Sequence, residues 1–299
     1  MGLLLICLAA VAWGTTGTTS VLIAQQATLS PLIVGLYRIV FALPVFWLWH
    51  GYNARQKSLA SWLFPPKHRL SLLAMGLCMA GYQVFYFAAV PYIGVAMTAL
   101  VAVCSSPLII ALLAIAFLGE KLTRSLCIAL ALGVTGTVLL IAQPEAVHVD
   151  GVRFFLGVVL AFGAAFSYAG YAIFAKSLVG RMDAIAIATY SFTVAALILT
   201  PTLVLHPPLG VWLKTLPLLL YLGVITGGLA YGIYMLGIRH TSATMAGLAV
   251  LLEPLTASLL GIFAFKEPIS GSGAVGAVLL IVGILCAQKG NATKHSKSH

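Results

Sequence analysis

Ten long apolar runs, separated by short polar links, make up almost the whole chain. A helix needs roughly 20 apolar residues to cross a bilayer, and each run is close to that length. The runs occupy residues 2–23, 32–49, 70–90, 93–118, 122–142, 154–175, 184–205, 216–237, 243–265 and 273–287. We therefore predict an all-α membrane protein with ten transmembrane helices.

The composition supports this prediction, because 62% of the residues are hydrophobic, 7% are charged and the mean hydropathy is +1.10. A soluble protein would not expose so much apolar surface. The net charge of +10 does not indicate a nucleic-acid partner, since most Lys and Arg residues lie in one set of alternate links. Only Arg153, Lys214 and Lys266 lie in the other set. The positive-inside rule places the basic links and both termini in the cytoplasm.

The second half of the chain repeats a pattern of the first. Pro107 precedes Glu120 by 13 residues, Pro254 precedes Glu267 by the same interval, and the two pairs are offset by 147 residues. Each half holds five spans, and an odd number means that the second half enters the membrane from the opposite side. We expect two inverted five-helix repeats around a central cavity, an arrangement typical of alternating-access transporters.

This repeat divides the chain into four parts. We expect a first five-helix repeat (1–142), a connecting loop (143–152), a second five-helix repeat (153–287) and a cytoplasmic tail (288–299). Because one chain holds a complete pair of repeats, a monomer is sufficient, and a dimer is also compatible.

The paired prolines and glutamates mark the fourth span of each repeat. Pro107 and Pro254 lack an amide hydrogen and clash with the carbonyl four residues earlier, which releases that carbonyl from the helical ladder. Each is either a hinge with a cavity-facing acceptor or a tolerated kink that helps helices to pack. We expect Glu120 and Glu267 to pair with the adjacent lysines or to cap the fifth helix of their repeat.

Two charged residues, Arg38 and Glu253, lie clearly within the predicted spans. A charge at this depth costs several kcal/mol unless it is paired or hydrated, so it marks a functional or network site. The depths of the two residues allow contact, either directly or through a polar network. Glu253 could bind a proton or a substrate ammonium when the halves rearrange, or the two charges could form a structural ion pair that locks two helices.

Aromatic and polar side chains recur at helical spacing in the middle of several spans. A buried phenol favours a hydrogen-bond partner, so these residues either join helices or line a cavity that stacks on a substrate. The hydroxyls of the first span could also bond to carbonyls of their own helix. The candidate substrate-binding residues are Trp13, Thr16, Tyr82, Gln83, Tyr86, Tyr168, Tyr171, Tyr231 and Tyr234.

Motifs for metal binding or catalysis are missing from the sequence. The five cysteines are isolated inside apolar spans without metal-ligand spacing, so we expect no metal and no cofactor. The sequence contains no H-E-x-x-H or G-x-S-x-G motif and no paired intramembrane aspartates, which disfavours an intramembrane enzyme. The spans also lack the clustered Lys or Arg that phosphates and nucleotides would need, so the expected cavity is largely neutral.

Several short motifs together resemble the drug/metabolite transporter superfamily and, within it, the ten-helix EamA-type exporters. The motifs are Trp13-Gly14, Tyr37-Arg38, Ser106-Pro107, Leu118-Gly119-Glu120-Lys121-Leu122, Leu252-Glu253-Pro254 and Phe265-Lys266-Glu267-Pro268. The resemblance covers the whole chain in order, and its length and aromatic-rich spans are most similar to the YddG-type amino-acid exporters. It implies a bacterial inner-membrane exporter of small metabolites.

We therefore expect an alternating-access exporter of amino acids, either apolar and aromatic or broad in range, or of related small metabolites. An exporter of drugs or other metabolites with the same fold stays open as an alternative. A lipid flippase or scramblase would also use this fold, but it needs a groove open to the bilayer. A channel is disfavoured, because opposed halves suit rocking better than a constant pore.

Overall fold

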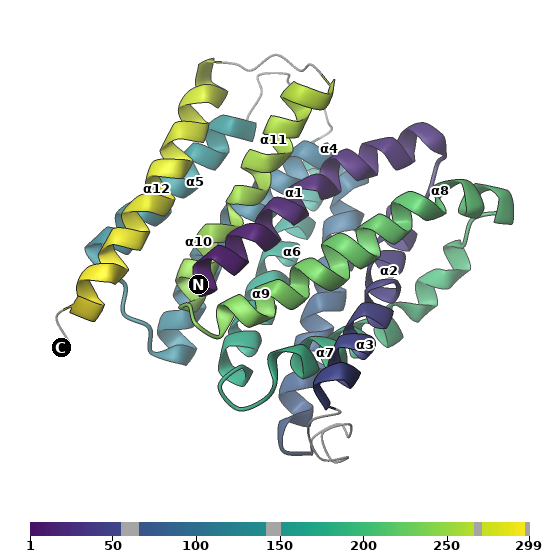
Figure 1. Ribbon diagram of the computed structural model, residues 1–299. Helices are drawn as coiled ribbons and strands as arrows, with labels where there is room; N and C mark the ends of the chain where they lie inside the picture. Colours follow the sequence, from purple (N-terminus) through teal and green to yellow (C-terminus); the bar gives the residue numbers. More distant parts are fainter. Residues whose placement is uncertain (55–65, 142–150, 266–270, 297–299) are drawn as a thin grey trace.

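The computed structural model describes residues 1–54, 66–141, 151–265 and 271–296, and these residues form helices joined by short connections (Figure 1). The predicted loop residues 143–150, Lys266 and Glu267 lie outside the described residues. In chain order the elements are α1 (Gly2–Gln26), α2 (Pro31–Val40), α3 (Ala42–Ala54), η2 (Pro66–His68), α4 (Arg69–Leu118), α5 (Arg124–Ile141), α6 (Gly151–Leu178), α7 (Ala184–Leu199), η3 (Thr200–Leu205), α8 (Leu209–Tyr221), η4 (Leu222–Leu229), α9 (Ala230–Ile238), α10 (Ala243–Val250), α11 (Leu252–Phe265) and α12 (Gly271–Ser296).

The prediction of ten membrane-spanning helices is confirmed. Among the described residues, eight helical segments are long and apolar enough to cross a bilayer, and the shorter apolar helices Arg124–Leu140 and Gly271–Ala287 complete the ten. Helix α4 contains both the third and the fourth span. Gly94 interrupts it with a φ of 75°, a backbone conformation that favours glycine and lets the chain turn between the two spans. Helix α12 continues through most of the predicted tail.

Two spans are broken inside the bundle, and a proline accounts for each break. The second span divides at Phe41, between α2 and α3, and the ninth divides at Leu251, between α10 and α11. Pro44 and Pro254 follow these breaks by three residues. Because proline excludes the carbonyl four residues earlier from the helical ladder, α2 ends at residue 40 and α10 at residue 250.

Pro107 lies differently from Pro254. It sits inside the continuous fourth-span part of α4, and the only left-handed backbone in that helix is at Gly94. The two prolines thus occupy unlike local geometries, although they are equivalent in the sequence repeat. A hinge role for either one stays a prediction.

The eighth span has a wider turn at its centre, where the π-helical segment η4 joins α8 to α9. Glycines on η4 allow backbones to approach closely. A Cβ on Gly223 would lie 2.2 Å from the Cβ of Phe41, and a Cβ on Gly227 would lie 2.7 Å from the carbonyl oxygen of Arg38. The wide turn of the eighth span is therefore packed directly against the break in the second span.

Buried side chains form two main clusters. The larger draws on α1, α2, α3, α4, α6, α7 and α9, and the second lies between α4, α5, α10, α11 and α12. Helices α5 and α12 lie side by side at one edge of the bundle (Figure 1). Their backbones touch, since a Cβ on Gly136 would lie 2.6 Å from the carbonyl oxygen of Gly276. Small residues at helix contacts are typical of membrane bundles.

Glu120 differs from the expectation based on the sequence. Its carboxylate does not cap α5, the fifth span, but accepts hydrogen bonds at the start of α10. The donors are the Ala243 amide at 2.6 Å, the Thr244 amide at 3.2 Å and the Thr244 hydroxyl at 2.7 Å. The side chain therefore links the end of the fourth span to the start of the ninth.

Candidate substrate-binding site

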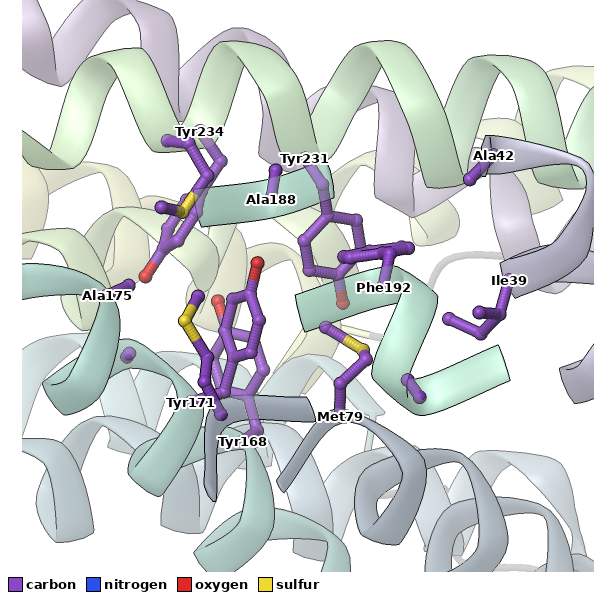
Figure 2. Close-up of a cluster of buried hydrophobic side chains, with 14 of the residues drawn as sticks. Ile39, Ala42, Met79, Tyr168, Tyr171, Ala175, Ala188, Phe192, Tyr231 and Tyr234 are labelled. Carbon is purple, nitrogen blue, oxygen red and sulfur yellow. The ribbon is translucent and has the colours of Figure 1, made fainter. Parts of the chain in front are cut away.

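Seven of the predicted aromatic residues come together in one cluster, which we call the aromatic cluster. Its members are Trp13 from α1, Tyr82 and Tyr86 from α4, Tyr168 and Tyr171 from α6, and Tyr231 and Tyr234 from α9. The Trp13 ring centroid lies 4.6 Å from that of Tyr231 and 5.4 Å from that of Tyr234. Figure 2 shows Tyr168 and Tyr171 reaching toward Tyr231 and Tyr234 from the opposite side.

The indole of Trp13 fixes the cluster to the eighth span. Its Nε1 donates a hydrogen bond of 2.9 Å to the carbonyl oxygen of Thr226, inside the π-helical segment η4. Thr226 itself is fully buried, and its hydroxyl is bonded to the carbonyl of Leu222. The backbone carbonyl of Thr226 is thus a buried acceptor whose partner comes from another helix.

Trp13→Phe is expected to lower the free energy of unfolding by about 1–3 kcal/mol, because the phenyl ring leaves the buried Thr226 carbonyl without its donor. Thermal and denaturant unfolding of the purified protein in detergent would measure this change. Trp47→Phe is the matched control, since Trp47 lies 36% exposed at the surface. Equal losses for both variants would contradict the role of the Trp13 hydrogen bond.

The two intramembrane charges flank the aromatic cluster. Arg38 is buried, at 5% exposure, whereas Glu253 is half-buried. In the described part of the chain the Arg38 Nε atom has no hydrogen-bond partner. Arg38 is therefore not locked into a direct pair through that atom.

Close backbone contacts place each charge. A Cβ on Gly14 of α1 would lie 2.6 Å from the carbonyl oxygen of Glu253, so α11 touches α1 one residue beyond Trp13. The carbonyl of Arg38 touches η4 at Gly227, next to the Thr226 acceptor of Trp13. Trp13 and η4 thus lie between the two charged segments.

Gln83 carries a buried side-chain amide without a hydrogen-bond partner. Only 2% of its surface is exposed, and neither the Oε1 nor the Nε2 atom of its amide has a hydrogen-bond partner among the described residues. A Cβ on Gly35 would lie 3.5 Å from the Gln83 Cβ, so Gln83 packs against α2 three residues before Arg38. Burying an unpaired amide is costly, so its two ends are suited to a ligand or to water.

Most hydroxyls of the first span bond to carbonyls of their own helix, and one of them is left without a partner. Thr15, Thr19 and Ser20 donate to carbonyls of their own helix at 2.7, 2.9 and 2.8 Å. The Thr16 hydroxyl is buried and has no partner among the described residues. Of these side chains, Thr16 is therefore the one whose polar group is available at the site.

Part of the site keeps accessible surface although it lies in the middle of the bundle. Tyr82, Tyr86, Thr16 and Glu253 are half-buried, whereas the remaining members of the aromatic cluster are fully buried. All nine predicted substrate-binding residues lie on helices that meet here. Sequence reasoning missed Phe192, whose ring centroid lies 5.1 Å from that of Tyr231, and the carbonyl of Thr226.

The site does not resemble a metal centre. In residues 1–54, 66–141, 151–265 and 271–296, no group of three or more His, Cys, Asp or Glu side chains could hold a metal ion. The cysteines are free thiols on separate spans. What the geometry offers instead is a pair of opposite charges, an amide and a wall of aromatic rings.

Ten apolar spans around a polar and aromatic centre define a multi-pass membrane transporter rather than an enzyme. The EamA-like transporter family matches residues 1–142 and again residues 155–287, and the chain belongs to this family, within the drug/metabolite transporter superfamily.

Two curated relatives and one solved structure show how far the similarity reaches. The chain is 34% identical over 293 residues to the uncharacterized transporter YwfM of Bacillus subtilis (strain 168), covering 94% of this chain and 92% of YwfM. It is 24% identical over 294 residues to the uncharacterized inner membrane transporter YicL of Salmonella typhimurium, covering 95% and 94%. A crystal structure with 21% identity superposes with a TM-score of 0.77 over 96% of both chains, which shows the same fold.

Proposed function

We propose that this EamA-family transporter exports amino acids, apolar and aromatic or of a broad range, or closely related small metabolites, across a bacterial inner membrane. The observation that carries the proposal is that the segments bearing the opposite charges Arg38 and Glu253 contact η4 and α1 on either side of Trp13. A zwitterionic amino acid carries a carboxylate that suits a guanidinium and an ammonium that suits a carboxylate. An apolar side chain suits the rings of the aromatic cluster.

The polar groups without partners support the same substrate class. The Gln83 amide can donate to a carboxylate or accept from an ammonium, and Gln83 packs against α2, the helix that carries Arg38. Thr16 adds a hydroxyl next to Trp13. The amide of Gln83 and the hydroxyl of Thr16 are few polar groups among side chains that are mostly apolar. Sites of this composition bind small molecules with one polar end and one apolar end.

The family and the sequence repeat support alternating access. The family matches the two halves of the chain separately, and the half-buried Tyr82, Tyr86 and Glu253 supply accessible surface for a central chamber. We infer that the two halves are inverted repeats that rock around this chamber. The similarity to YicL, an uncharacterized inner membrane transporter, supports placement in the inner membrane. The basic links support both termini in the cytoplasm.

Counterflow in proteoliposomes tests the substrate class. Labelled phenylalanine is expected to accumulate against an excess of unlabelled phenylalanine, whereas phenethylamine and 3-phenylpropionate, which each lack one of the two charges, are expected to drive counterflow at least about tenfold less well. Protein-free liposomes give the background rate. Equal counterflow by the three compounds would favour an exporter of drugs or other metabolites, and no counterflow across a panel of amino acids would refute the proposal.

A lipid flippase or scramblase is the second candidate, and one feature favours it. A cavity of about 230 Å³ lies between α2, α3, α7 and η3, and its lining includes Leu197 and Leu203, which are exposed on the bundle surface. Such an apolar opening suits a lipid tail. Fluorescent-lipid transbilayer assays with the same proteoliposomes distinguish the two candidates, because an amino-acid exporter is expected to leave lipid flipping at the protein-free rate.

A further inference from the structure

Glu120 connects the two halves that the family matches separately. It follows α4 in the first half, and its carboxylate accepts from the Ala243 amide, the Thr244 amide and the Thr244 hydroxyl of α10 in the second half. Gly119, with a φ of 65°, ends α4 in the left-handed conformation, and this turn directs the next residue toward α10. Three charge-assisted hydrogen bonds therefore cross between the halves at one point.

This contact is more than an ordinary helix cap. The first amides of a helix lack partners within the helix, and a carboxylate suits them and the positive end of the helix dipole. Helix α10 already has a local cap, because the Ser242 hydroxyl accepts from the Met245 amide at 3.2 Å. Asp183 caps α7 locally in the same way, accepting from Ile185 and Ala186. Glu120 adds to α10 a second cap that comes from another part of the chain.

The surroundings place this contact at the end of the bundle that carries the basic links. Lys176, in the last turn of α6, donates a hydrogen bond of 3.0 Å to the carbonyl of Ile238 at the end of α9, and Glu120 acts on it electrostatically. Farther into the bundle the same two helices touch, because a Cβ on Gly247 would lie 3.4 Å from the Cα of Pro107. The interface between α4 and α10 thus runs from Pro107 out to Glu120.

We propose that Glu120 is a latch that holds the cytoplasmic side of the transporter closed, and that its bonds to α10 must break before this side opens. Separating α4 from α10 would leave both the carboxylate and the first amides of α10 to water. The latch thus favours the form closed at this side without touching the substrate site. The inference is independent of which compound is transported.

Spin labels across the latch test this inference in the full-length protein in lipid nanodiscs. In a background with the five cysteines replaced, cysteines at the exposed positions Lys121 and Arg239 report the distance between the two halves. Glu120→Gln removes the charge, and Thr244→Val removes the hydroxyl donor from the other side while keeping its shape. We expect each variant to raise the population with a long distance about tenfold, since a charge-assisted bond is lost.

Ser242→Ala is the matched control, because it removes the local cap of the same helix α10 from within the second half. We expect it to keep the parent distance distribution. An unchanged distribution in both Glu120→Gln and Thr244→Val would overturn the latch, and so would an equal shift in Ser242→Ala. Failure of amino-acid counterflow with the distance shift intact would refute the proposed substrate and leave the latch standing.

Discussion

Replacing Arg38 with glutamine is expected to lower amino-acid export by roughly ten- to a hundredfold, because a charge-assisted contact to the substrate carboxylate is lost. The Arg38 side chain is buried, at 5% exposure, in the middle of the bundle. The same change leaves the carboxylate of Glu253 without its counter-charge. The initial rate of counterflow in proteoliposomes measures the effect on transport, and denaturant unfolding in detergent measures the effect on stability.

Glu253→Gln and the double variant Arg38→Gln/Glu253→Gln separate the role of these charges in transport from their role in stability. Each single variant is expected to lower the free energy of unfolding by about 3 kcal/mol, since it leaves one intramembrane charge uncompensated. The double variant holds no uncompensated charge, so it should be more stable than the sum of the single losses predicts, while export stays lost. Normal export by both single variants would show that the charges have a purely structural role.

Gly223→Ala is expected to produce the largest loss of stability among single-methyl substitutions. The added Cβ would lie 2.2 Å from the Cβ of Phe41, and 3.1 Å from its Cα, so η4 and the break in the second span must move apart. Overpacking of this kind costs about 1–3 kcal/mol or more. The change in melting temperature in detergent, read from tryptophan fluorescence, measures this loss of stability. Export should fall as well, because Arg38 precedes Phe41 by one turn.

Gly17→Ala provides the comparison within the same protein. Gly17 lies in the interior of α1, and a Cβ there would meet no atom within 4 Å. Alanine loses less backbone entropy than glycine on folding, so this variant should gain about 0.5–1 kcal/mol. If Gly223→Ala proves as stable as Gly17→Ala, the close contact between η4 and Phe41 does not exist in the membrane.

The spans and the aromatic cluster could be predicted from the sequence for the same physical reason. A bilayer requires long apolar helices, and it makes a mid-span tyrosine or arginine unusual enough to be noticed. Trp13, Tyr82, Tyr168 and Tyr231 were selected on that basis, and they do lie together. Their convergence needs no exact packing, only spans that meet near the same depth.

Other features depend on contacts between distant segments and left no local signal. Glu120 stands beside α5 in the sequence, yet its partners are 123 and 124 residues away. The Thr226 carbonyl is available to Trp13 only because the eighth span widens into a π-helix. Phe192 is one apolar residue among many in α7. The glycines at 223, 227 and 228 were the one visible hint of close packing at η4.

Both intramembrane charges lie next to a break in their transmembrane span. Arg38 precedes the break at Phe41 by three residues, and Glu253 follows the break at Leu251 by two. Rotation at either joint changes the gap between guanidinium and carboxylate. A substrate that binds both Arg38 and Glu253 would restrict movement at both breaks, and its release would restore that movement. Under the proposed function, substrate binding is therefore expected to restrict bending at both breaks.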